Sequence, residues 1–256
     1  MRRARIKRKT PKRLIEGRNP ILEALLAKTV ISRIWIASSV VKNKKIRQLL
    51  RLASQRQVSV KKTDRKSLDK ISQTKLHQGV IAFASSLPRF SLTRLLEKKK
   101  RKEGFCFLLL TEVLDEQNLG AILRTAEATG VTAVIIPKRA KGVTSVVART
   151  AMGAAEYLPV VKENLFSAIK ILKKQGAQIV GAEPKSGKIL YQMDLRGPVA
   201  FVVGGEDRGL TAPIKKACDF LVSIPMRGKV SSLNMSVACA VLLYEKLRQE
   251  MVKNGS

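Results

Sequence analysis

The sequence predicts an α/β protein in which a parallel sheet covered by helices on both faces is preceded by a smaller α/β unit. Apolar strand-like runs alternate with helix-like segments throughout residues 104–256, which is typical of such a sheet. Hydrophobic residues make up 45% of the 256 residues, enough to fill two cores. No apolar run approaches about 20 residues, so the sequence excludes a membrane-spanning helix.

Charge divides the chain into two unlike parts. Residues 1–103 carry 30 Lys and Arg against 6 Asp and Glu, whereas residues 104–256 carry 20 against 13. A strongly basic part joined to a nearly balanced part is typical of a polyanion-binding module attached to a second module. The basic residues are spread over several predicted elements rather than along one amphipathic helix, which favours nucleic acid over a membrane surface. Aromatic residues make up only 4%, so we expect recognition of folded RNA by its shape and phosphates rather than by base stacking.

We predict three parts within residues 1–103: a basic flexible arm at 1–13, a compact α/β domain at 14–87 and a linker at 88–103. The arm holds eight Lys and Arg and no acidic residue. The linker contains Pro88 and the charged run EKKKRKE at Glu97–Glu103. In the compact domain, apolar spacing predicts helices at Arg18–Leu26, Asn43–Gln57 and Asp64–Ile71 and strands at Ser32–Ala37, Val58–Lys61 and Gly79–Ala84.

Residues 104–256 form the second predicted domain. Strands are predicted at Phe105–Val113, Val131–Pro137, Tyr157–Val161, Ala177–Ala182, Val199–Val203 and Phe220–Ile224. Helices are predicted at Asn118–Thr129, Leu165–Gln175, Thr211–Ala217 and Leu233–Glu250. Ligands of parallel sheets usually lie outside the carboxyl ends of the strands. This rule directs attention to three loops, Leu114–Gly120, Gly204–Leu210 and Pro225–Asn234.

Several common kinds of site are excluded. His77 is the one histidine, so no His-based triad or general base can lie in the second domain. Three widely separated cysteines are typical of buried, reduced thiols in a cytosolic protein, and we predict neither disulfides nor a metal site. The segment Gly181–Ile189 resembles a phosphate loop, but its spacing is wrong, and no GxGxxG follows the first strand of this domain. The charged start of the chain lacks the apolar run of a secretory signal, so we expect a cytoplasmic protein.

The three candidate loops carry more polar residues and glycines than turns require. In the first, Arg124 lies one helical turn beyond Gly120 among apolar neighbours, where an exposed helix arginine is the simplest interpretation. The second follows a fully apolar strand with two glycines, which permit close backbone approach to a ligand. The third leads into the last helix with four polar side chains although one suffices as an N-cap. These four are Ser231, Ser232, Asn234 and Ser236.

In this order, the three segments resemble the three signature motifs of the SpoU/TrmH family, the RNA ribose 2'-O-methyltransferases of the SPOUT (trefoil-knotted) class. The matching residues are Asn118, Gly120 and Arg124; Gly204, Gly205, Glu206, Gly209 and Leu210; and Ile224, Pro225, Met226, Ser232, Leu233, Asn234 and Ser236. Residues 14–87 resemble that family's ribosomal-protein-like RNA substrate-binding domain. The segments IEGRNPILEAL and HQGVIAFA are especially close to the type that methylates a guanosine of large-subunit ribosomal RNA. Glu116 departs from the family, which commonly has proline there, and we expect it to loosen the turn before Asn118.

The resemblance implies a SPOUT parallel sheet with a deep trefoil knot, a homodimer, and S-adenosylmethionine bound in a bent form against the knot. By position, the cofactor contacts expected from the resemblance are Gly204, Gly205, Ile224, Met226 and Leu233. The partner that it implies is 23S-type ribosomal RNA or its precursor particle.

Transfer of a sulfonium methyl group to a ribose 2'-hydroxyl requires alignment of the two groups and removal of the hydroxyl proton. The resemblance assigns this assistance to Arg124. Free arginine has a pKa above about 12, so two roles stay open. Arg124 either loses a proton in a specialised setting, or it holds the phosphate and stabilises the alkoxide while another group takes the proton. Asn118, Glu206, Ser232 and Asn234 are expected to orient Arg124 and the ribose, and in a dimer Arg124 could act at the partner's cofactor site.

Two other functions stay open. One is the same chemistry on a guanosine of transfer RNA, against which the resemblance of the N-terminal domain argues. The other is a non-catalytic RNA-binding or ribosome-assembly protein that kept the fold. The presence of Arg124, Glu206 and Asn234 together argues against this second alternative, because such a protein has no chemical need for all three.

Overall fold

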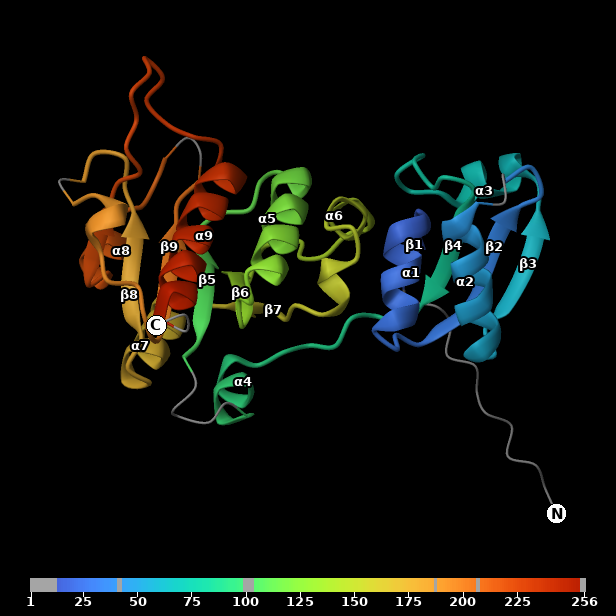
Figure 1. The fold of residues 1–256 in the computed structure, drawn as a ribbon, viewed down its shortest axis with the longest axis horizontal. Coiled ribbons are helices and arrows are strands. Elements are labelled where there is room, and N and C mark those ends of the chain that lie inside the picture. The colour runs from blue at the N-terminus through green and yellow to red at the C-terminus, as the bar shows by residue number, and fades with distance from the viewer. Residues whose placement is uncertain (1–12, 41–42, 99–103, 187, 206–207, 254–256) are drawn as a thin grey trace.

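A six-stranded, entirely parallel sheet forms the centre of the C-terminal part of the chain in the computed structural model, which describes residues 13–40, 43–98, 104–186, 188–205 and 208–253 (Figure 1). Its strand order is β10-β8-β9-β5-β6-β7, and every neighbouring pair is parallel. The strands are β5 (Cys106–Leu110), β6 (Ala133–Pro137), β7 (Val160–Glu163), β8 (Gln178–Ala182), β9 (Val199–Val203) and β10 (Phe220–Val222). The predicted parallel sheet is therefore confirmed.

Helices cover both faces of this sheet, which explains why its strands are apolar throughout. One face packs against α5 (Glu116–Ala128), α6 (Ser145–Thr150) and α9 (Met235–Lys253). The other packs against α4 (Leu92–Lys98), α7 (Leu165–Lys174) and α8 (Ala212–Ala217). Along β5 the side chains alternate between the two cores: Leu108 and Leu110 enter the first, and Phe107 and Leu109 enter the second.

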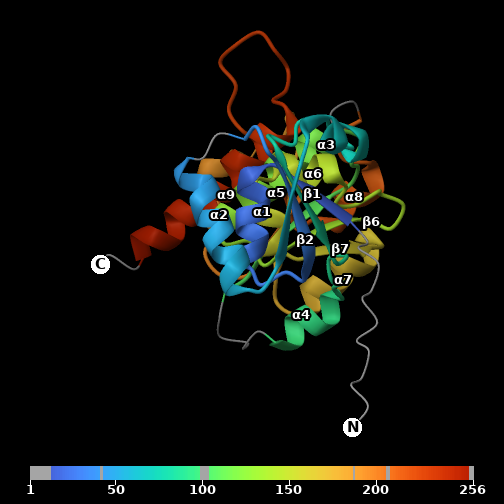
Figure 2. The ribbon, with the colours of Figure 1, turned by 90° about the vertical axis from the view of Figure 1, so that its right-hand side faces the viewer.

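The N-terminal part forms its own four-stranded sheet, with strand order β1-β4-β2-β3. Its elements are β1 (Arg13–Glu16), α1 (Arg18–Leu26), β2 (Ile31–Ala37), α2 (Lys44–Gln55), β3 (Ser59–Thr63), α3 (Arg65–Ile71) and β4 (Val80–Ala84). Strands β2 and β3 are parallel, and the other pairs are antiparallel. Figure 2 shows α1 and α2 on one side of these strands, where they enclose the N-terminal core. The predicted compact α/β unit is confirmed as a fold class.

Several predicted boundaries differ from the observed ones, for local reasons. Strand β1 was not predicted, and it includes Arg13, which we had assigned to the flexible arm; residues 1–12 lie outside the described residues. Helix α4 lies within the predicted linker. Helix α6 was missed because three of its six residues, in the segment SVVART, are β-branched and have low helix propensity. Helix α5 begins at Glu116, two residues earlier than predicted, with Asp115 as its N-cap. Glu116 is the first residue of α5, a position at which proline is also favoured. The expected loosening of the turn before Asn118 is not observed, because the helix already begins at Glu116.

The two parts of the chain are joined by a polar junction centred on Glu156, whose side chain is only 2% exposed. Its Oε2 accepts hydrogen bonds from Arg13 Nη2 and from Thr29 Oγ1, each at 2.7 Å. Tyr157 donates its hydroxyl to Glu23 Oε2 at 2.9 Å. Burial and this hydrogen bond raise the pKa of Tyr157 to about 12, so the hydroxyl stays a donor at neutral pH. A buried charge that is paired and hydrogen-bonded fixes geometry, and the junction therefore holds the two parts in one arrangement.

Within the described ranges, no helix combines the length and apolar character needed to cross a bilayer.

Candidate active site

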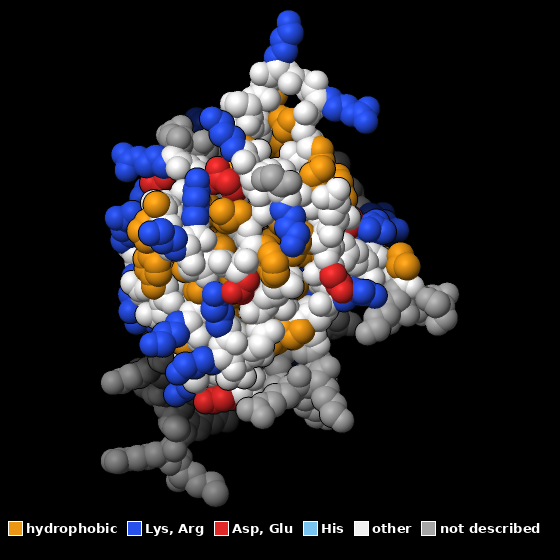
Figure 3. Space-filling model, turned by 90° about the vertical axis from the view of Figure 1, so that its left-hand side faces the viewer, with side chains coloured by type: hydrophobic (Ala, Val, Ile, Leu, Met, Phe, Trp, Pro, Cys, Tyr) orange, Lys and Arg blue, Asp and Glu red, His pale blue; other side chains and the backbone are white. Residues whose placement is uncertain are grey.

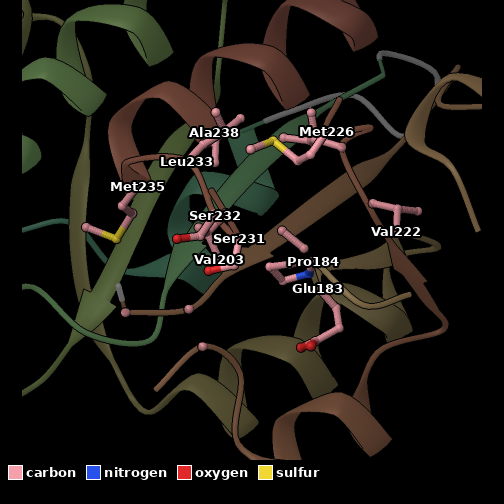
Figure 4. Close-up of a pocket in the computed structure, with 15 residues that line it drawn as sticks. Glu183, Pro184, Val203, Val222, Met226, Ser231, Ser232, Leu233, Met235 and Ala238 are labelled. Atoms are coloured by element: carbon pink, nitrogen blue, oxygen red, sulfur yellow. The ribbon is translucent and has the colours of Figure 1, made fainter. Parts of the chain in front are cut away.

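A pocket opens at the carboxyl ends of β8, β9 and β10, where the parallel sheet predicts a ligand site. Its empty space is about 670 Å³ when the open solvent at its mouth is included. Figure 4 shows Ser231 and Ser232 in the middle of the lining residues, with Leu233 and Ala238 on one side and Pro184 on the other. The second and third predicted loops are therefore brought together at one cavity.

All five residues predicted to contact a cofactor line this pocket. They are Gly204, Gly205, Ile224, Met226 and Leu233. In the described part of the chain, the backbone groups of Ile224, Met226 and Leu233 make no hydrogen bonds. Because they have no partner among the described residues, these backbone groups can form hydrogen bonds to a ligand in the pocket.

Gly204 of the second motif is required by close backbone packing, whereas the contact at Gly205 is with the end of a flexible side chain. A Cβ atom on Gly204 would lie 2.2 Å from the carbonyl carbon of Gly209, and one on Gly205 would lie 2.5 Å from Glu112 Oε2. The Gly209 amide donates to the Gly205 carbonyl at 2.9 Å, which closes the loop on itself. Glu206, predicted to act in catalysis, lies outside the described residues. The pocket wall thus consists of bare backbone at the end of β9.

The first and third motifs are joined by a direct contact between two asparagines. Asn234 Nδ2 donates to Asn118 Oδ1 at 3.1 Å. Asn234 Oδ1 accepts the Ser236 amide at 2.9 Å and the Ser236 hydroxyl at 2.6 Å, so the same side chain caps α9. Neither asparagine is among the lining residues of the pocket. The pair instead fixes the start of α5 against the start of α9.

Arg124 lies on α5 with its side chain exposed, outside the pocket of its own chain. Its side chain forms no hydrogen bond or ion pair with any other described residue. Four residues earlier, Gly120 packs so tightly against α6 that a Cβ atom there would lie 2.5 Å from Thr150 Cβ. The glycine of this motif thus serves helix packing, and its arginine faces solvent in the single chain.

The third motif begins as a projecting loop between β10 and α9. Residues 225–232 are exposed, and Met226 is 37% exposed although it lines the pocket. Figure 3 shows this loop standing above the surface with basic side chains at its end; Arg227 and Lys229 lie there. On the same face, acidic and basic side chains are interspersed. Such a loop can contact a polyanion that lies over the pocket.

Sequence reasoning missed several lining residues. Glu183 and Pro184 follow β8 directly, and Glu183 pairs with Lys215 Nζ at 2.8 Å. They belong to the segment rejected as a phosphate loop, which lines the pocket without having that motif. Their place at the carboxyl end of a parallel strand is the signal that could have identified them. The other missed residues are Ala182, Val203, Val222, Met235 and Ala238, whereas the lining residues Gly209 and Ser231 belong to the candidate loops singled out from the sequence.

The thiols behave as expected from their surroundings. Cys106 and Cys239 are buried, Cys218 is half-buried, and none of the three is in a disulfide. Burial raises the pKa of Cys239 to about 12 and that of Cys218 to about 11, so neither is a reactive thiolate at neutral pH. Within the described ranges, His, Cys, Asp and Glu side chains form no cluster that could hold a metal ion.

Comparisons with known proteins agree on both parts of the chain. The model of the SpoU rRNA Methylase family matches residues 106–244, and a model described as RNA 2'-O ribose methyltransferase substrate binding matches residues 14–90. The 23S rRNA (guanosine-2'-O-)-methyltransferase RlmB of Pseudomonas aeruginosa is 40% identical over 222 residues, covering 86% of this chain and 89% of its own. The putative TrmH family tRNA/rRNA methyltransferase YacO of Bacillus subtilis is 37% identical over 237 residues, covering 91% and 94%.

Solved structures show the same similarity. An RNA 2'-O ribose methyltransferase superposes with a TM-score of 0.81 at 29% identity, covering 93% of this chain and 88% of its own. The SpoU methyltransferase AviRb from Streptomyces viridochromogenes, crystallised with the cofactor AdoMet, superposes with a TM-score of 0.76 at 25% identity, covering 93% and 90%.

Proposed function

Because this chain belongs to the SpoU rRNA methylase family, we propose that it methylates the 2'-hydroxyl of a guanosine ribose in 23S-type ribosomal RNA. Its activity is that of an RNA 2'-O-methyltransferase, and its methyl donor is S-adenosylmethionine. The observation that carries the proposal is the combination, in one chain, of the pocket at β8, β9 and β10 with a basic N-terminal part that matches a substrate-binding model. The guanosine and the ribosomal substrate are supported by the named activity of the Pseudomonas relative. We propose that the enzyme is cytoplasmic, and we keep the division into an arm, a domain at 14–87, a linker at 88–103 and a domain at 104–256, with Arg13 moved from the arm to the first domain because it belongs to β1.

The pocket fits the cofactor in the chemistry of its walls. Leu233 and Ala238 offer apolar surface, the backbone around Ile224 offers unpaired polar groups, and Ser231 and Ser232 offer hydroxyls. S-adenosylmethionine has an apolar-faced purine, polar ring edges and a charged amino acid end, and when bound it supplies an electrophilic methyl group. We propose that Gly204, Gly205, Ile224, Met226 and Leu233 hold it. The trefoil knot stays a prediction from the resemblance.

Arg124 is proposed as the residue that assists loss of the ribose proton. A guanidinium group brought to the 2'-hydroxyl would stabilise the developing alkoxide and hold the adjoining phosphate. Removal of the proton by Arg124 itself requires the uncharged guanidine, whereas the second role uses the charged guanidinium, so the two roles differ in their pH dependence. The Asn118–Asn234 pair would fix the start of α5, and with it the position of Arg124. Glu206 and Ser232 are proposed to orient the ribose.

We propose that Arg124 acts at the cofactor site of a second copy of this chain. It is exposed and has no partner among the described residues of its own chain. Helix α9, which packs against α5, exposes Val237, Tyr244 and Met251 at intervals of seven residues, so they lie on one side of the helix. An apolar stripe on an exposed helix is typical of a helix-mediated interface between identical subunits. A homodimer through this face would bring two sets of motifs together.

The proposed function is tested by transfer of labelled methyl from S-adenosylmethionine to unmodified 23S-type ribosomal RNA and to bulk transfer RNA, with identification of the labelled nucleoside. We expect 2'-O-methylguanosine in the ribosomal RNA alone. Label in transfer RNA would assign the chain to the sister activity. Label in a precursor particle but not in naked RNA would make the particle the substrate. Failure to label any RNA or particle would refute the proposal and leave the non-catalytic alternative.

A further inference from the structure

Two adjoining recesses lie where the N-terminal sheet meets α6, and they share Asn19, Arg65 and Gln78. We call them together the junction cleft. Its basic side chains are Arg18, Lys45, Arg65, Lys75 and Arg149. The first four come from the N-terminal part, whereas Arg149 comes from α6 in the C-terminal part. The recess that contains Arg149 therefore exists only while the two parts are docked, whereas the other recess is lined by the N-terminal part alone.

The charge of the junction cleft is unbalanced. Its lining includes no Asp or Glu. None of its five basic side chains forms an ion pair in the part of the chain that the structure describes, and Arg149 has a buried Nε without a hydrogen-bond partner. Basic side chains that converge on a recess without acidic partners produce a positive potential that attracts an anion. A hydrogen bond with His77 lowers the pKa of the nearby Asp69 carboxyl. The charges of Arg65 and Lys75 help to lower this pKa, but Asp69 lines neither recess, so the lining itself keeps an excess of positive charge.

One wall of the cleft, the loop at residues 72–79, is built on a buried carboxylate. Glu16 is 1% exposed and accepts hydrogen bonds from the Ser72 hydroxyl at 2.6 Å, the Gln73 amide at 2.6 Å and the Thr74 hydroxyl at 2.5 Å. Burial tends to raise its pKa, but these hydrogen bonds outweigh burial and lower it below the ordinary value of 4.5. Glu16 is thus held as an anion that anchors the loop.

The loop carries two side chains in an unfavourable backbone conformation. Lys75 has φ 59° and Gln78 has φ 53°, in the left-handed region that non-glycine residues rarely adopt. Between them, buried His77 accepts the Gly79 amide at Nδ1 and contacts Asp69 through Nε2. Gln78 in turn accepts the Arg18 amide at 3.2 Å, which ties the loop to the start of α1. The two residues with this unfavourable backbone conformation, Lys75 and Gln78, are thus residues that line the cleft.

The cleft lies on the side of the molecule where the active-site pocket opens. In Figure 1 the connection between α3 and β4 is at the top, as are the carboxyl ends of β5, β8 and β9 and the projecting loop before α9. Helix α6, which supplies Arg149, also packs against α5 at Gly120, so one helix links the cleft to the element that carries Arg124.

We propose that the junction cleft binds the phosphodiester backbone of the substrate RNA, and that Arg149 is a substrate-positioning residue that reaches it from the catalytic side. This inference rests on the proposed function only in the identity of the RNA. Three guanidinium or ammonium groups line each of the two adjoining recesses, with Arg65 shared, and they fit successive phosphates, which position RNA without reading its bases. An RNA held at the cleft and at the projecting loop would present an intervening ribose to the pocket.

The test compares two full-length double variants with equal loss of charge. Arg65→Gln/Arg149→Gln alters the cleft, and Lys170→Gln/Lys174→Gln removes two exposed lysines from α7 on the far face of the sheet. Binding to an unmodified 23S-type ribosomal RNA transcript is measured between about 50 and 200 mM salt. Each phosphate contact contributes about 0.7–0.9 to the slope of log affinity against log salt concentration. We expect the cleft variant to bind about ten-fold more weakly or worse, with a salt slope reduced by about one to two units. The control should bind as the wild type does, and S-adenosylmethionine affinity should be unchanged in both.

Three further measurements make the result decisive. Arg149→Lys should recover part of the affinity, because it restores charge but not the planar fork. In methyl transfer, the cleft variant should raise KM with kcat within about two-fold, as expected for loss of binding equal in ground and transition states. Arg65→Gln alone changes an exposed side chain and repeats the test without risk to folding.

Equal affinities and salt slopes in the two double variants would overturn the inference, because net charge rather than the cleft would then govern binding. The binding readout also separates this inference from the proposed function. If the wild type methylates no RNA while the cleft variant alone loses affinity, the cleft stands and the proposed function fails. If the wild type methylates RNA and both variants match it in affinity, the reverse holds.

Discussion

Asn234 serves two elements with one side chain. Its carbonyl oxygen caps α9 through Ser236, while its amide nitrogen reaches Asn118 at the start of α5. A cap alone contributes about 1 kcal/mol, which serine or aspartate would also provide. An ionised aspartate has no donor and serine has a single oxygen close to its backbone, whereas the asparagine amide accepts at the cap with one atom and donates across to the other helix with another. The chemistry at this position therefore depends on an asparagine rather than on any capping residue.

Arg124→Ala should reduce kcat by at least about 100-fold, the lower end of what proton-transfer assistance contributes. Because Arg124 is exposed and outside the pocket, S-adenosylmethionine binding and thermal stability should stay at the wild-type level. Single-turnover methyl transfer and calorimetric titration of the cofactor measure the two effects. Retained turnover in this variant would show that Arg124 has no catalytic role.

Mixing variants tests whether Arg124 acts across a dimer. Ala238→Leu fills the pocket, and Arg124→Ala leaves the pocket intact, so each homodimer should be inactive. If Arg124 acts at the partner's site, a mixed dimer contains one complete site, and the mixture should regain up to about a quarter of wild-type activity, since half of randomly assorted dimers are mixed. A mixture that stays inactive while light scattering shows subunit exchange would place Arg124 at its own chain's pocket.

Gly204→Ala should abolish cofactor binding and destabilise the fold by about 1–3 kcal/mol, because its Cβ would collide with the backbone of Gly209. Gly228→Ala is the matched control, since a Cβ there meets nothing within 4 Å. Cofactor titration and denaturant unfolding of both variants measure the difference. Normal cofactor binding by the Gly204 variant would mean that close backbone approach at this strand end is not needed.

At the scale of residues, the three ordered motifs pointed to more of the pocket lining than the chemical type of any single residue did. The predicted cofactor residues all line one cavity. They could be predicted because glycines and a loop of small residues form a recognisable sequence pattern. Glu183 and Pro184 were missed because neither residue type is unusual in a loop. The exposed state of Arg124 follows from its helix position, but the sequence cannot say which chain's pocket it reaches.

At the scale of elements, the loop at 72–79 makes stability depend on pH through Glu16. Its pKa is lowered in the folded state, so its contribution is complete above the ordinary value of 4.5 and is lost as the pH falls below it. Glu16→Gln should destabilise the protein by about 2 kcal/mol at pH 7, because hydrogen bonds to a charged acceptor are lost. Thermal unfolding from pH 7 to pH 3.5 should show the two proteins converging at the acid end. A constant gap across this range would contradict the anchoring role.

Most elements were predicted from the sequence, including short ones such as α8 with six residues and β10 with three. Helix α1 begins and ends at the predicted residues, and α7 ends one residue short of the prediction. Strand β1, with four residues, and α6, with six, were not predicted. Both lie at the junction between the two sheets, so the elements that dock the parts together were the ones that local sequence could not reveal.

At the scale of the whole molecule, deletion of residues 1–87 should weaken RNA binding far more than cofactor binding. The deletion removes four of the five basic residues of the junction cleft but none of the residues that line the pocket. It also removes both donors to Glu156, so some loss of stability is expected. Filter binding of ribosomal RNA and calorimetry of the cofactor give the two affinities. Equal losses would contradict the assignment of RNA binding to the N-terminal part.

The docking of the two parts could not be predicted from the sequence. Arg13 and Glu156 are 143 residues apart, and a single charged pair at that separation leaves no periodic or compositional trace. The charge asymmetry indicated two modules, but it says nothing about the angle or contact between them. The parallel sheet and its ligand-binding edge were predictable because they follow from patterns repeated along the chain.

The fit of Gly153 against the N-terminal part limits how this protein can be recombined with its relatives. Gly153 has φ 102°, and a Cβ there would lie 2.3 Å from Glu23 Cβ, so the two surfaces match at the level of single atoms. A graft that exchanges residues 14–87 alone would set a foreign surface against this glycine and Glu156. We therefore expect an exchange of the N-terminal part between relatives to preserve the docking only when residues 145–157 of the other part are exchanged with it.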